Sequence, residues 1–93
     1  MTDDDETVNE QAVVAYLARL PDDPAALAAK AAEQEARLAY WLAQARTYSY
    51  RMDRCTTIEA RRRNARRAGV SLQHAQTARE WLEAIRRRTE ERS

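Results

Sequence analysis

A stripe of residues from Leu27 to Met52, polar only at Gln34, recurs at alternating steps of four and three, the heptad spacing of α-helices that pack side by side. This stripe consists of Leu27, Ala31, Gln34, Leu38, Trp41, Ala45, Tyr48 and Met52. The chain has one glycine among its 93 residues, and its two prolines, Pro21 and Pro24, lie close together. Because few of its residues favour strands, the sequence predicts an all-α fold.

The predicted helices cover residues 8–20, 24–52 and 57–90. The last two are long and joined by a short connection, so we expect them to form an antiparallel, coiled-coil-like hairpin. The first helix is short and covers only the open end of this hairpin. Residues 46–67 are therefore expected to form a bare two-helix tip.

The starts of the predicted helices are marked by residues that bind free backbone amides. Thr7 with Glu10, and Thr56 with Glu59, each fit a capping box. Asp23 is followed by a proline, a combination typical of the first residues of a helix.

The third predicted helix carries two sets of residues spaced seven apart, which together form its expected buried seam. They are Ile58, Ala65 and Leu72, and Ala68, Ala75 and Leu82, with Ile85 continuing the seam. Arg61 also falls on this seam. Gly69 costs a helix about 1 kcal/mol, but the seam keeps its phase across it, which favours one continuous helix. The alternative is a break at Gly69 with Ser71 as a new N-cap.

The core is expected to be thin. Leucine, isoleucine and valine together number 13, against 19 alanines. A chain this short with so few large apolar side chains is marginally stable by itself. We therefore expect a second copy of the chain, or a protein partner, to supply further burial.

Charge is distributed unevenly along the chain. Residues 1–36 carry a net charge of −7 and residues 37–93 a net charge of +8. We assign residues 1–6 to an acidic tail and residues 7–93 to a single helical domain. The asymmetry fits a basic binding surface that an acidic segment shields, or two halves that neutralise each other within the fold.

Residues with catalytic or metal-binding chemistry are few and scattered. Cys55 and His74 are the only thiol and the only imidazole, and on one helix they would lie about 28 Å apart. One histidine and one cysteine do not make a zinc site of nitrogen and sulfur ligands, and a single glycine makes no glycine-rich phosphate loop. We expect no enzymatic activity, no cofactor, no metal and no small-molecule substrate.

The expected location is the cytoplasm. No segment is long and apolar enough to cross a membrane, the acidic N-terminus is unlike a signal peptide, and the cysteine has no second cysteine to pair with. The 15 arginines and single lysine suggest a GC-rich genome, such as that of an actinobacterium or its phage, in which case a virion is the alternative location.

The strongest local signal is a run of five arginines within residues 61–67, preceded by Arg51 and Arg54. The run resembles the arginine-rich helices of some viral RNA-binding proteins, which implies binding to phosphates, and the nearby tyrosines are placed to stack on bases. Otherwise the run is a solvated face or binds an acidic protein. The expected partner-binding residues are Arg62, Arg63, Arg66, Arg67, Arg51, Arg54, Tyr48, Tyr50 and Trp81. Arg61 is left out because it falls on the seam.

Residues 65–71 also resemble the turn of helix-turn-helix DNA-binding proteins, in which a small residue precedes a glycine by four. That resemblance implies a recognition helix over about 71–81, within a degenerate motif near 61–80, with Gln73, His74, Gln76 and Thr77 reaching bases. Asn64, Ala75 and Ala78 depart from the pattern, because the family buries bulky aliphatic residues at those positions.

These observations predict a small, non-enzymatic adaptor or assembly protein that acts by protein–protein interaction or self-association in a phage or bacterial complex. Trp41 is expected in the core, and Trp81 either in the core or at an interface. The alternative is a nucleic-acid-binding or regulatory protein that uses the arginine-rich segment or the degenerate helix-turn-helix.

Overall fold

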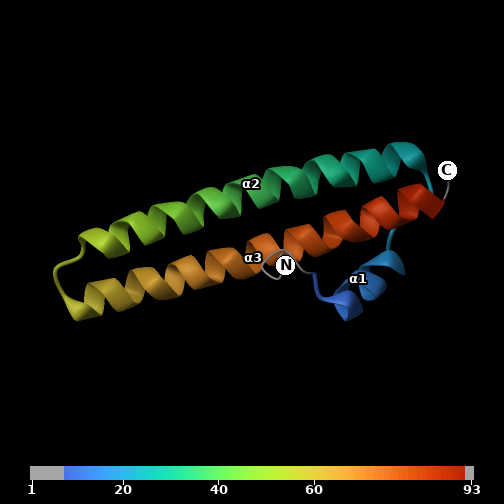
Figure 1. The fold of residues 1–93 in the computed structure, drawn as a ribbon. Helices are drawn as coiled ribbons and strands as arrows, with labels where there is room; N and C mark the ends of the chain where they lie inside the picture. The colour runs from blue at the N-terminus through green and yellow to red at the C-terminus, as the bar shows by residue number, and fades with distance from the viewer. Residues whose placement is uncertain (1–7, 92–93) are drawn as a thin grey trace.

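The computed structural model describes residues 8–91, which form three α-helices and, within that range, no strand. They are α1 (Glu10–Leu17), α2 (Pro24–Arg54) and α3 (Ile58–Glu91). As Figure 1 shows, α2 and α3 run antiparallel along the length of the molecule, and α1 packs against α3 at the open end of the hairpin. The predicted all-α hairpin is confirmed. No helix of the described chain is long and apolar enough to span a bilayer.

The second helix forms where its cap and its heptad stripe predict. The Asp23 carboxylate accepts a hydrogen bond from the backbone N–H of Ala26 at 2.9 Å, and Pro24 is the first helical residue. The helix ends at Arg54, two residues beyond the predicted end. Every residue of the predicted stripe from Leu27 to Met52 is buried or half-buried.

The third helix is continuous from Ile58 to Glu91. A Cβ added at Gly69 would have no atom within 4 Å, so this glycine faces open space on a regular helix. The turn of a helix-turn-helix is therefore wrong for this chain, because residues 71–81 continue the same helix. The predicted Thr56 cap is also displaced by one residue, since Thr57 Oγ1 accepts the hydrogen bond from the N–H of Ala60 at 3.2 Å.

The buried face of α3 differs from the predicted seam. Its half-buried and buried residues on the side facing α2 are Asn64, Ala68, Ser71, Ala75, Ala78, Leu82 and Ile85. Ile58 and Leu72 are 64% and 50% exposed, and Ala65 is also exposed, so that half of the predicted seam is wrong. The observed row consists mostly of small residues, which let the α3 backbone lie close to the large side chains of α2.

Arg61 is likewise not on the seam. It is exposed, and its guanidinium donates a hydrogen bond to the backbone carbonyl of Cys55 at 3.3 Å, in the connection between α2 and α3.

The first helix is shorter than predicted, at eight residues, and is capped by Asn9, whose side chain accepts a hydrogen bond from the N–H of Ala12. The predicted helix, about 8–20, is therefore two residues too long at its start and three too long at its end. Glu10 does not complete a capping box, because its carboxylate binds the guanidinium of Arg87. Thr7 and the acidic tail lie outside the described residues.

Within residues 8–91, the buried hydrophobic side chains larger than alanine all lie at the open end of the hairpin, which we call the base. Val13, Leu20, Leu27, Ala84 and Ile85, contributed by α1, the loop after it, α2 and α3, form a buried cluster there. Away from the base, the buried hydrophobic residues are alanines. The base therefore anchors the hairpin, and the tip at residues 46–67 projects beyond it.

Candidate anion-binding groove at the hairpin tip

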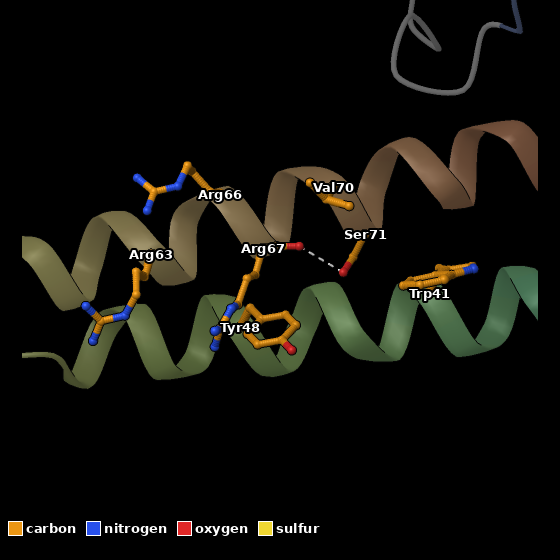
Figure 2. A pocket seen from close by; sticks show the side chains of 7 residues that line it. All are labelled: Trp41, Tyr48, Arg63, Arg66, Arg67, Val70 and Ser71. Atoms are coloured by element: carbon orange, nitrogen blue, oxygen red, sulfur yellow. Dashed lines mark hydrogen bonds between the residues drawn. The ribbon is translucent and has the colours of Figure 1, made fainter.

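An open groove of about 470 Å³ lies between α2 and α3, next to the tip. Trp41 and Tyr48 line it from α2, and Arg63, Arg66, Arg67, Val70 and Ser71 line it from α3 (Figure 2). Trp41 and Tyr48 are seven residues apart, so they lie on one face of α2 about 10 Å from each other along the axis.

The groove exists because the two helices contribute side chains of different size. Ala68 and Ser71 are the buried residues of α3 in this region, and both are too small to fill the space between two aromatic rings. The Ser71 hydroxyl donates to the backbone carbonyl of Arg67 at 2.9 Å, so it is turned back onto its own helix. The floor is therefore aromatic and the α3 rim is basic.

The five arginines of residues 61–67 form no ion pair with any residue in 8–91. The segment from Arg46 to Arg67 carries eight arginines against only Asp53 and Glu59. Glu59 forms no ion pair within the described structure either. The tip is thus a concentrated positive surface whose five arginines at 61–67 have no carboxylate partner within residues 8–91.

The arginines at the base behave in the opposite way. Arg86 pairs with Glu83 and Glu90, and Arg87 pairs with Glu10 and Glu83. Arg88 pairs with Asp22 and Glu91 and donates to the backbone carbonyls of Leu17, the last residue of α1, and of Leu20. Arg87 and Arg88 therefore tie α3 to α1 and to the loop that follows it, whereas Arg86 pairs only with residues of α3 itself.

Charge pairing at the base also changes the acidity of its carboxyl groups. Hydrogen bonds from Arg86, and then from Arg87, hold the pKa of Glu83 below its usual range. A hydrogen bond from Arg87 lowers the pKa of Glu10 in the same way. Both carboxylates stay ionised in the folded protein, so the base is an internally neutralised cluster.

Tyr48 organises two of the tip arginines. The guanidinium carbons of Arg51 and Arg67 lie 5.6 and 5.8 Å from the centre of its ring. Figure 2 shows the Arg67 side chain extending from α3 across to Tyr48 on α2. Cation–π contacts of this kind restrict long, otherwise mobile side chains. A second such pair lies outside the groove lining, with Arg54 4.6 Å from the ring of Tyr50.

The structure thus brings only part of the predicted partner-binding set together. Arg63, Arg66, Arg67 and Tyr48 line the groove. The exposed residues Arg51, Arg54, Arg62 and Tyr50 belong to the same tip but do not line it. Trp81 lies in the base, half-buried, with its ring stacked on Tyr16 at 4.1 Å between centroids. It is a core residue rather than a neighbour of the arginines.

Trp41 is the groove residue that sequence reasoning assigned to the core. It is half-buried, and its ring stacks on that of His74, with centroids 4.2 Å apart and planes inclined by 21°. Its place on the stripe predicted a core position, whereas the structure leaves it half-buried at the groove and outside the core cluster. The seven-residue spacing from Tyr48 was the available signal that the two rings share a surface.

Cys55 lies in the connection between α2 and α3. Its sulfur contacts the carbonyl of Arg51 at 3.1 Å and the side-chain amide of Asn64 at 3.2 Å. In the part of the chain that the structure describes, no three histidine, cysteine, aspartate or glutamate residues are grouped so as to hold a metal ion.

No protein-family model, no curated protein and no solved structure matches the chain.

Proposed function

We propose that the protein is a non-enzymatic adaptor whose hairpin tip docks on an anionic partner. The observation that carries this proposal is the contrast between the two ends of α3. Arg86, Arg87 and Arg88 are paired within the fold, whereas residues 61–67 present five arginines that no carboxylate in residues 8–91 neutralises.

The energetic cost of placing so many arginines close together supports a role for the charge of the tip. Like charges three and four residues apart on a helix repel each other by a few tenths of a kcal/mol per pair. An anionic partner relieves that repulsion and releases the bound counterions. The base, with its buried cluster and ion pairs, serves as the scaffold from which the tip projects.

The proposed setting is a phage or bacterial complex in a reducing compartment, the host cytoplasm or a particle assembled there. A free thiol at Cys55 supports a reducing compartment. The thin, alanine-rich seam of the hairpin supports self-association or a protein partner as part of this function.

The test compares two variants of the full chain that lose the same charge. One carries Arg62→Gln, Arg63→Gln, Arg66→Gln and Arg67→Gln at the tip. The control carries Arg19→Gln, Arg37→Gln, Arg79→Gln and Arg86→Gln elsewhere. Glutamine is nearly as good a helix former as arginine, so circular dichroism should show that both variants remain helical.

Elution from immobilised heparin, used as a generic polyanion, measures the docking. We expect the tip variant to elute at a much lower salt concentration than the unmodified protein, and the control variant to elute close to it. Equal elution of the two variants would show that only net charge matters, which would refute docking through the tip.

A further inference from the structure

We infer that the groove between α2 and α3 binds single-stranded nucleic acid, with phosphates on Arg63 and Arg67 and an unpaired base against Trp41. This inference rests on the proposed function and names the class of anionic partner.

The rim of the groove has the chemistry of a phosphate site. Arg63 and Arg67 are four residues apart, so they project from the same side of α3. A guanidinium group binds phosphate oxygens through two parallel hydrogen bonds. Arg67 is already held against Tyr48, so less side-chain freedom is lost when it binds a phosphate. The Arg51 guanidinium on the same tyrosine adds further positive charge.

The floor of the groove has the chemistry of a base site. Trp41 is fixed in place by its stack on His74, and Val70 supplies an apolar contact on the opposite helix. Aromatic side chains beside a basic groove are the arrangement by which proteins bind unpaired bases, because every base has a face that stacks. The groove volume of about 470 Å³ is in the range of sites that enclose small ligands.

The same features disfavour the other polyanions. An acidic polypeptide uses the arginines but gains nothing from a tryptophan floor. A duplex presents its phosphates outside and keeps its bases stacked inside, so it meets the rim without reaching Trp41. A single strand is the partner whose phosphates and bases use both the rim and the floor.

Fluorescence anisotropy with labelled probes tests the inference on the full chain. The probes are a short oligothymidylate, an oligouridylate of equal length, a DNA duplex of the same length and a polyglutamate peptide. We expect the two single strands to bind more tightly than the duplex or the peptide. DNA and RNA single strands are two sources of the same chemistry, and tight binding of either supports the inference.

Matched double variants locate the site. Arg63→Gln with Arg67→Gln should weaken single-strand binding about tenfold and reduce its slope against log salt by about 1.4, as for two lost phosphate contacts. Arg37→Gln with Arg86→Gln removes the same charge outside the groove and should change both quantities far less. The two arginines of this control are themselves exposed and pair only with glutamates of their own helices, and such pairs contribute little to stability.

Tryptophan fluorescence reports the base contact directly. In a Trp81→Phe background Trp41 is the only tryptophan, and the aromatic stack on Tyr16 is kept. We expect saturating oligothymidylate to quench this emission along the same binding curve that anisotropy gives. Trp41→Leu should weaken single-strand binding about tenfold while leaving heparin elution nearly unchanged.

The outcomes separate this inference from the function on which it rests. Equal or tighter binding of the duplex or of polyglutamate, or single-strand binding without quenching of Trp41, overturns the single-strand site and leaves an anion-docking tip. Failure to bind any of the four probes or heparin overturns both proposals.

Discussion

At the scale of single residues, a buried glutamate fastens α1 to the hairpin. Glu80 is 6% exposed, and its carboxylate accepts hydrogen bonds from the N–H of Asn9 at 3.1 Å and from the side-chain amide of Gln76. Asn9 is the N-cap of α1, where a negative charge is favoured by the helix dipole. Glu80 thus gives α1 the contact that sequence reasoning assigned to Glu10.

Replacing Glu80 with alanine should destabilise the protein by about 1–3 kcal/mol, because it leaves a partly buried N–H without its acceptor. Urea unfolding measures the change, and amide hydrogen exchange should show faster exchange across Glu10–Leu17. Glu90→Ala serves as the control, because it removes only one exposed ion pair with Arg86. If the two variants are equally stable and α1 exchanges at the same rate in both, Glu80 does not anchor α1.

At the scale of helices, the sequence predicted the buried face of α2 but only part of the buried face of α3. On α2 the stripe was predicted correctly, because large residues such as Trp41 and Tyr48 mark a single face of the helix. On α3 two neighbouring rows repeat every seven residues. The row containing Ile58 and Leu72 has the larger side chains, yet the row containing Ala75 is buried. Which of the two rows is buried depends on the size of the α2 residues opposite, and the sequence of α3 alone does not give that information.

The sequence also predicted the helix starts and the candidate site only in part. Asn9 and Thr57 cap helices in place of Thr7 and Thr56, because several good capping residues stand close together and local sequence does not choose among them. The arginine cluster is recognisable in the sequence, because its members are neighbours on one segment whatever the alignment of α2 and α3. The contact of Arg67 with Tyr48 is not, because it depends on how α2 and α3 are aligned.

Gly69 offers a direct check on the continuity of α3. Gly69→Ala should stabilise the protein by about 0.5–1 kcal/mol, because a helical glycine facing open space gains from losing backbone freedom in the unfolded chain. The urea midpoint should rise with an unchanged slope. Ala65→Gly, also at an exposed position of α3, should lower it by a similar amount. Destabilisation by Gly69→Ala would indicate a break in the helix at this residue.

At the scale of the whole molecule, stability and charge are placed at opposite ends. The base holds the buried apolar side chains larger than alanine and the paired arginines Arg86, Arg87 and Arg88. The tip, with the aromatic groove beside it, holds the five arginines at 61–67, which have no ion pair within residues 8–91. Between them the α2–α3 interface relies largely on alanine, and Ile58, Val70 and Leu72 remain half or more exposed on α3. The fold therefore leaves both a basic tip and an incompletely covered apolar surface.

This distribution leads us to expect association in solution. With only 13 leucine, isoleucine and valine residues in the chain, burial within one copy is small, and a second copy or a partner adds to it. The melting temperature should then rise with protein concentration, as it does whenever association favours the folded state. A compact monomer in sedimentation equilibrium, with a melting temperature independent of concentration, would be contrary to this expectation.

Whether the hairpin tip binds the single strand is tested most directly by mapping the bound surface residue by residue. Backbone amide chemical shifts of the full chain, followed during titration with oligothymidylate, distinguish the tip from the base. We expect shifts concentrated at residues 41–51 of α2 and 61–74 of α3, with residues 80–88 unaffected. Shifts centred on the paired arginines Arg86, Arg87 and Arg88, or spread evenly over the molecule, would contradict binding at the tip.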